Sequence, residues 1–167
     1  KTKSDIKDKL HSFRNGLKKS AWPSQCDYSC PTLFWSASLL KWKGLDTFIE
    51  CLNMFNDNQR PTTNICYIKP KDTLLGICNI DPELPAVNWH CSPDNIDKIR
   101  ACSNIFISTS QNEPFGLSIL EALAAGQCVL IPADGAYWDN RLTNGIDCIK
   151  YEPNSPTDLS LKLKKLV

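Results

Sequence analysis

Short apolar runs alternate along the chain with stretches in which apolar residues recur at helical spacing. Several of the runs are continuously apolar, which is typical of parallel strands buried on both faces. We therefore predict strands over residues 32–38, 64–69, 86–90, 104–108, 127–132 and 147–151. Between them, the helical patterns predict helices over residues 43–58, 72–78, 93–101 and 114–125, and a last helix from residue 156.

Capping residues predict where several of these helices begin and end. Ser92 is the expected N-cap of the third helix, and Pro114 suits the first position of the fourth. Gly126 is the expected stop of that fourth helix, and Ser155 opens the last one. The first helix has an apolar stripe of Leu45, Phe48, Ile49, Leu52 and Phe55.

Alternating strands and helices predict an α/β fold with a doubly wound, Rossmann-like parallel sheet. With 167 residues the chain fits a single domain. We assign residues 32–167 to this domain, and residues 1–31 to a basic segment, helical over about 4–19, that leads into a linker at 22–31. Because doubly wound sheets bind ligands beyond the carboxyl ends of their strands, functional residues are expected in the loops after the first four strands.

Composition and cysteine usage favour a soluble protein. Hydrophobic residues make up 42% of the chain and charged residues 22%. No apolar run approaches the roughly 20 residues of a membrane span, and the first ten residues lack the apolar core of a signal peptide. The nine cysteines are odd in number and most lie in apolar segments, so we expect buried thiols in a reducing cytoplasm. Cys26 and Cys30 lack a second pair, and no metal site is predicted there.

The charge is close to balanced overall but uneven along the chain. A formal net charge of +1 gives no case for nucleic acid binding. Within residues 1–20, however, seven Lys or Arg face two Asp. A solvated helix face or linker explains this excess, and peripheral contact with an anionic membrane, at its inner face, is the alternative.

The loop after residues 104–108, TSQNEPFGLSILEALAAG, carries the clearest chemistry. With Pro114 at the first helical position, the backbone N–H groups of Phe115, Gly116 and Leu117 are expected to be free to bind an anion at the positive end of the helix dipole. Gly116 has no side chain, so a ligand can approach this backbone closely. Phosphate is the usual occupant of such a site.

Two carboxylates flank this expected anion site. Glu113 precedes the helix and Glu121 lies two turns inside it, so both can face one elongated ligand. A nucleoside diphosphate sugar has that layout, with phosphates at the helix start and hydroxyl groups near the carboxylates. Each glutamate taken singly is also explained as a helix-start acid or a solvated or paired side chain. Their combination with a strand, a proline and a glycine favours a binding site.

The segment EPFGLSILEALAAG, between the strands NIFISTS and CVLIP, resembles the signature of the retaining glycosyltransferases of family four, which have the GT-B fold. KWKGLDTFIECL and VNWHCSPDNIDKIRACSNIFIS are similar to two further segments of that family. The resemblance covers roughly residues 32–167. It implies the carboxyl-terminal, donor-binding half of such an enzyme, whose amino-terminal lobe binds the acceptor and is expected to be missing here.

The resemblance also implies a role for particular residues. Glu121 corresponds to the ribose-binding residue, and Glu113 to the one near the donor sugar and the reacting carbon. Lys43 corresponds to the lysine that neutralises the leaving diphosphate, a catalytic contribution. The backbone contacts to sugar and diphosphate correspond to Phe115, Gly116 and Leu117. The nucleobase is expected in loops near Pro70 and Ser92, and no metal or other cofactor is implied.

The sequence departs from the family pattern at two places. Ser38 stands where the family usually has an arginine, five residues before the lysine. Lys41 can substitute as a point charge but lacks the bidentate fork of arginine. Altered donor handling, weak activity, or a clamp built from Lys41 and Lys43 are the three possibilities, and solvated charges at a helix start are the alternative for both lysines. In addition, KPKD replaces the family's glycine-rich loop after the second strand.

We expect a hexosyltransferase-type donor domain that binds a nucleoside diphosphate sugar for retaining transfer and is inactive when isolated. Surface polysaccharide or glycoconjugate synthesis is the family's commonest setting. The alternative is a non-catalytic Rossmann-like module for assembly or regulation, which Ser38 favours. A nucleotide-sugar epimerase of similar architecture would not be expected to carry the two-glutamate motif. Tyr137 and Trp138 are expected to pack, with contact to a sugar ring as the alternative.

Overall fold

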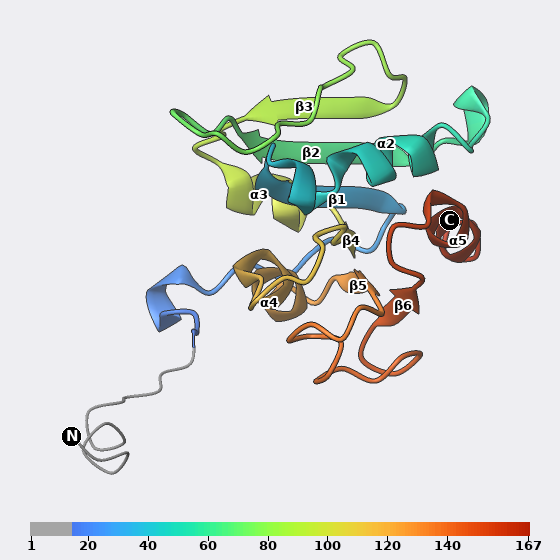
Figure 1. Cartoon of the computed structure of the whole chain (residues 1–167). Helices are drawn as coiled ribbons and strands as arrows, with labels where there is room; N and C mark the ends of the chain where they lie inside the picture. Colours follow the sequence, from blue (N-terminus) through green and yellow to red (C-terminus); the bar gives the residue numbers. More distant parts are fainter. Residues whose placement is uncertain (1–14) are drawn as a thin grey trace.

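The computed structural model describes residues 15–167 and has a single sheet of six parallel strands. The strand order is β3-β2-β1-β4-β5-β6, which Figure 1 shows from the green edge strand to the red one. This confirms the doubly wound α/β prediction. The strands are β1 (Thr32–Ser38), β2 (Thr62–Ile68), β3 (Val87–Cys91), β4 (Ile105–Ile107), β5 (Cys128–Pro132) and β6 (Ile149–Tyr151).

Helices cover both faces of this sheet. The α-helices are α2 (Leu45–Leu52), α3 (Ile96–Ala101), α4 (Leu117–Ala124) and α5 (Pro156–Leu163), and short 3₁₀ turns are η1 (Lys19–Ala21), η2 (Lys41–Lys43) and η3 (Asp57–Gln59). Alternate residues of β1 point to opposite faces. Trp35 belongs to the core beneath α2 and α5, whereas Phe34 packs with the residues of α3 and α4.

The order in which strands are added to the sheet reverses at β1, which pairs with β2 on one side and with β4 on the other. From β1 the chain builds outward to β3, and it then returns to form β4 beside β1. Such a reversal leaves a crevice beyond the carboxyl ends of the two central strands, because the connections that follow them lead to opposite sides of the sheet. The loops that follow β1 and β4 therefore border this crevice.

The helix predicted over residues 72–78 is wrong. These residues form an irregular loop instead. The Lys41 N–H donates to Gly76 O and the Cys78 N–H to Leu39 O, so the segment pairs with the connection after β1 rather than with itself. Leu74 and Leu75 remain exposed to solvent. The apolar residues that suggested a helix here do not form a buried helical face.

Two predicted helix starts are also wrong. Ser92 is not an N-cap, because it lies in the left-handed region with φ 48° and its N–H donates to Tyr67 O, and α3 begins only at Ile96. Pro114 is not the first residue of α4, because Gly116 has φ 76° and interrupts any helix across it. The helix predicted over 43–58 divides into α2 and the short turn η3. By contrast, Ser155 caps α5 as predicted, since its hydroxyl accepts from the Asp158 N–H.

The basic segment is described only in part. Residues 4–14 of the predicted helix lie outside the described residues, and residues 15–18 are not helical. Further along, the Cys26 N–H donates to Ala125 O and the Tyr28 hydroxyl to Gly126 O, so this connection packs against the end of α4. Within residues 15–167, no helix has the length and apolar character to cross a membrane.

The cysteines only partly follow the prediction of burial. All nine are free thiols. The prediction is wrong for Cys30, Cys91 and Cys102, which are exposed. The buried ones are Cys26, Cys51, Cys66, Cys78 and Cys148.

Candidate functional site

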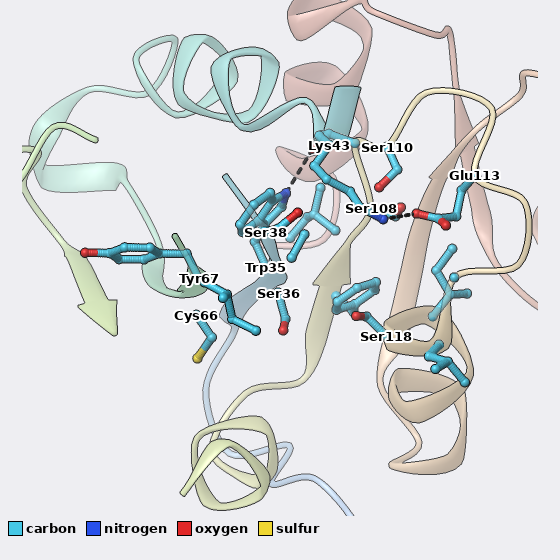
Figure 2. Close-up of a pocket in the computed structure, with 18 of the residues that line it drawn as sticks. Trp35, Ser36, Ser38, Lys43, Cys66, Tyr67, Ser108, Ser110, Glu113 and Ser118 are labelled. Atoms are coloured by element: carbon cyan, nitrogen blue, oxygen red, sulfur yellow. Dashed lines mark hydrogen bonds and ion pairs between the residues drawn. The ribbon is translucent and has the colours of Figure 1, made fainter. Parts of the chain in front are cut away.

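A cavity of about 660 Å³ lies beyond the carboxyl ends of β1, β2 and β4, at the start of α4. Its walls come from the last residues of these strands, the loops that follow β1 and β4, and the first turn of α4, several of whose side chains are labelled in Figure 2. Hydroxyl groups are frequent along the walls: Ser36, Ser38, Ser92, Ser108, Thr109, Ser110 and Ser118. A volume of this size is typical of small-molecule sites.

Lys43 enters the cavity from the turn η2, whose course is fixed by the next residue. Gly44 has φ 71° and is packed against the loop after β4. A Cβ atom added at Gly44 would lie 2.2 Å from the Thr109 carbonyl oxygen, a distance that no side chain tolerates. Glycine is thus required here both by its backbone conformation and by this close approach. The Lys–Gly pair holds the two loops in contact.

Lys43 forms an ion pair with Glu113 across the cavity, between Nζ and Oε2. Figure 2 shows the lysine reaching from the loop after β1 to the carboxylate in the loop after β4. Only 17% of the Lys43 side chain and 14% of the Glu113 side chain are exposed. Lys43 Nζ also lies 3.8 Å from the centroid of the Trp42 ring. In the part of the chain that the structure describes, Lys43 is the one cation in the cavity lining, and Glu113 already balances its charge.

The start of α4 forms the wall next to this ion pair. The helix begins at Leu117, directly after Gly116, so the N–H groups of Leu117 and Ser118 have no partner within the helix, whereas those of Ile119 and Leu120 donate to Gly116 O. Gly116 O accepts from Trp138 Nε1 at 3.2 Å, which ties this wall to the loop after β5. Phe115 packs on Tyr137 and Trp138, with ring centroids 4.8 and 5.4 Å apart. The helix start can therefore present backbone N–H groups to an anion from a braced position.

Glu121 lies outside the residues that line the cavity. Its Oε2 accepts from Arg100 Nη2 at 2.5 Å, and Arg100 also pairs with Asp97. Arg100 is buried, with 3% of its side chain exposed, against 30% for Glu121. Burial raises the pKa of the Glu121 carboxyl, while the attraction of Arg100 lowers it by less.

The predicted site residues thus fall into two groups. The cavity lining brings together Ser38, Lys43, Ser92, Glu113, Phe115, Gly116 and Leu117. Glu121, Lys41 and Pro70 are not part of it. Lys41 instead forms an exposed ion pair with Asp46 at 3.1 Å.

Sequence reasoning missed several residues of this site. Trp35 and Thr109 are both buried in the lining and hydrogen-bonded to each other. Thr109 is the second residue after β4. Because ligands bind beyond the carboxyl ends of the strands, its position alone could have identified it. Trp35 lies inside a strand, where an aromatic residue is ordinarily part of the core. Arg100 gave no signal, since arginine on a surface helix is usually solvated.

Comparison with known proteins identifies the family to which this chain belongs. The sequence profile of the glycosyl transferases group 1 matches residues 84–167, about half of the chain, including the loop after β4 and all of α4. The chain belongs to this family. No curated protein matches the full sequence.

Solved glycosyltransferase structures share the fold of this domain at low sequence identity. The carboxyl-terminal domain of LpcC, a glycosyl transferase group 1 family protein from Francisella tularensis, has a TM-score of 0.68 and 19% identity, covering 90% of this chain and 87% of that one. A glycosyltransferase from Rickettsia africae has a TM-score of 0.63 and 18% identity, covering 83% of this chain and 38% of that one.

Anabaena HepE, solved in complex with UDP and glucose, has a TM-score of 0.64 and 17% identity, covering 80% of this chain and 38% of its own. The chain therefore spans less than half the length of the Rickettsia and Anabaena proteins. Its match to the LpcC domain shows the fold of a GT-B carboxyl-terminal domain.

Proposed function

We propose that this chain is the donor-binding domain of a retaining glycosyltransferase of family four, of hexosyltransferase type. The observation that carries the proposal is the Lys43–Glu113 ion pair, which lies in a cavity of about 660 Å³ beside the start of α4. A cation, a carboxylate and free helix N–H groups at one point match the phosphates and the sugar of a nucleoside diphosphate sugar.

In this proposal the diphosphate takes the place of Glu113 as the partner of Lys43. The lysine and the helix N–H groups then stabilise the negative charge that accumulates on the leaving phosphate. Glu113, released from Lys43, lies near the sugar and positions it or stabilises positive charge at the reacting carbon. The serine hydroxyls of the lining supply further hydrogen bonds to phosphate oxygens. Lys43 and the helix dipole supply the positive charge, so the proposal involves no metal.

The remaining parts of the proposal concern the setting. The acceptor site belongs to an amino-terminal lobe outside this chain, and the isolated domain binds donor without turning it over. We propose a cytoplasmic enzyme in surface polysaccharide or glycoconjugate synthesis, with peripheral contact at the inner membrane face as the alternative for the basic segment. The UDP and glucose bound to Anabaena HepE support uridine as the first base to test.

One observation favours a second function, a non-catalytic module for assembly or regulation. Ser38 lines the cavity where the family usually has an arginine, and Lys41 is paired with Asp46 outside the lining. The cavity then lacks a second cation within residues 15–167. A domain that has lost its anion clamp would keep this fold and bind no nucleotide.

Thermal denaturation with uridine, guanosine and adenosine diphosphates and their sugars separates these two functions. Under the proposal, one nucleotide at 100 times its Kd raises Tm by about 5–10 °C. Lys43→Met removes most of that shift because the phosphates lose their cation. Glu121→Ala removes it as well if Glu121 binds the ribose.

The matched control for the lysine variant is Lys98→Met. Lys98 is an exposed lysine of α3 that does not line the cavity, so its loss leaves the shift unchanged. The absence of a shift with every nucleotide would rule out donor binding and favour the non-catalytic module. A shift that survives in Lys43→Met would rule out the assigned role of the lysine.

A further inference from the structure

The hydroxyl group of Thr109, in the loop after β4, contacts both strand β1 and the loop that follows it. Its Oγ1 accepts a hydrogen bond from Trp35 Nε1 at 2.9 Å and donates one to the Lys43 carbonyl oxygen at 2.8 Å. The side chain is almost completely buried, with 4% of the residue exposed. This buried threonine thus uses its hydroxyl as both acceptor and donor, and loss of the hydroxyl removes both hydrogen bonds together.

Two backbone contacts reinforce this junction. The Gln111 N–H donates to Trp42 O at 2.8 Å, and Gly44 lies against the Thr109 carbonyl. Residues 42–44 and residues 109–111 are therefore held together at three successive points. Lys43, in the middle of the first segment, and Glu113, just beyond the second, then meet as an ion pair.

The position of the Lys43 backbone matters because the lysine side chain is long and flexible. Its ammonium group is a point charge on a four-carbon chain and does not orient itself. The backbone of residue 43 is the fixed end of that chain. A small shift of this backbone is thus transmitted to the one cation that residues 15–167 provide in the cavity lining.

From these contacts we propose that Thr109 is a positioning residue that fixes Lys43 for the diphosphate of the donor. The inference rests on the proposed donor-binding function and extends it to a residue that touches neither the phosphates nor the reacting atoms. The hydroxyl acts through the Lys43 carbonyl, while Trp35 holds that hydroxyl in the correct orientation.

The test compares UDP with uridine as probes, because only UDP engages Lys43. If the nucleotide panel selects another base, its diphosphate and nucleoside replace this pair. Kd is measured by calorimetry for the diphosphate and by NMR titration for the nucleoside. In Thr109→Val, which keeps the shape but removes the hydroxyl, the preference for the diphosphate over the nucleoside falls about tenfold. Thr109→Ser, which restores the hydroxyl, brings the preference back to within about twofold of wild type.

Thr63→Val is the matched control for loss of a buried hydroxyl. Thr63 is fully buried and donates to the Pro61 carbonyl at 2.9 Å, at the opposite end of the sheet from the cavity. This variant lowers Tm without changing the preference for the diphosphate. If Thr109→Val is too unstable to measure, Thr109→Ala removes the hydroxyl without placing a methyl group against Trp35 Nε1, and it shows the same fall.

The possible failures are distinguishable. If wild type binds UDP and Thr109→Val keeps the full preference, the positioning role is wrong and the proposed function stands. An equal loss for diphosphate and nucleoside also contradicts positioning, because it indicates a purely structural role. If wild type binds no nucleoside diphosphate at all, the proposed function and the positioning role both fall.

Discussion

Two ion pairs each contain a glutamate of the EPFGLSILE motif, one just before helix α4 and one within it. The two pairs differ in their access to the cavity. Lys43 and Glu113 come from two loops and line the cavity. Arg100 and Glu121 come from the neighbouring helices α3 and α4, and Arg100 is buried beside the Phe34 ring, 5.8 Å from its centroid. The two glutamates of one sequence motif therefore lie in physically different environments.

The difference separates an exchangeable pair from a structural one. An anion that enters the cavity can replace Glu113 as the partner of Lys43, because both side chains border the cavity. Arg100 has no such access, so its charge depends on the carboxylates of Glu121 and Asp97 that the fold supplies. Variants of Lys43 or Glu113 should change binding of the diphosphate, whereas loss of Arg100 should change stability.

The largest expected effect is on stability in the Arg100→Met variant. Removing the buried guanidinium leaves Glu121 and Asp97, which are 30% and 67% exposed, without their cation and lowers the free energy of unfolding by about 1–3 kcal/mol. Urea denaturation measures this change. Lys41→Met, which breaks the exposed pair with Asp46, serves as control and leaves the free energy of unfolding close to wild type. Equal effects in the two variants would contradict a structural role for the Arg100 pair.

A smaller effect is expected on binding in the Glu113→Gln variant. Losing the carboxylate frees Lys43 from competition, so the affinity for UDP rises about threefold to tenfold. Calorimetry measures the affinity, and Glu50→Gln, an exposed glutamate of α2, is the matched control. In a full-length enzyme the same variant loses sugar transfer. Weaker UDP binding in Glu113→Gln would mean that the carboxylate does not compete for the lysine.

The smallest expected effect is on the pH dependence of stability, through Glu121. Burial raises the pKa of this carboxyl, so the folded chain keeps the proton at pH values where the unfolded chain has lost it. The contribution of Glu121 to the free energy of unfolding therefore declines as pH rises from the usual glutamate pKa through the raised one. Replacement by glutamine removes the titration and flattens the profile.

Urea denaturation of wild type and Glu121→Gln between pH 4 and pH 7 tests whether the contribution of Glu121 to the free energy of unfolding declines as pH rises. The stability of the variant relative to wild type should increase with pH across the interval. A relative stability that decreases with pH would mean that Arg100 lowers the carboxyl pKa by more than burial raises it.

The sequence was sufficient to predict the sheet and the loops that carry the site. Short apolar runs mark the buried strands, and their ends predicted the loops after β1 and β4 as the site. The family resemblance then assigned Lys43 and Glu113 to it. Ser155 was also identified correctly, since its hydroxyl caps α5 through a contact three residues away. Such contacts are local, and their residues are visible together in the sequence.

Other features could not be predicted because distant residues decide them. The loop at 72–78 hydrogen-bonds to the connection after β1, which outweighs its own weak helical pattern. Ser92 adopts a left-handed conformation because its N–H continues the pairing with β2. The partner of Glu121 is Arg100, 21 residues earlier, and no spacing rule connects them. Tertiary contacts of this kind override local capping signals.

The contact between Lys43 and Glu113 joins residues that are 70 positions apart, through strands β1 and β4 that pair side by side. Closing so long a segment of chain costs conformational entropy, so we expect this contact to form after the local helices. On this expectation a partly folded chain has no donor site. Ligand binding therefore requires that β1 and β4 have already paired. Ligand added during refolding should not increase the rate of any step that precedes this pairing.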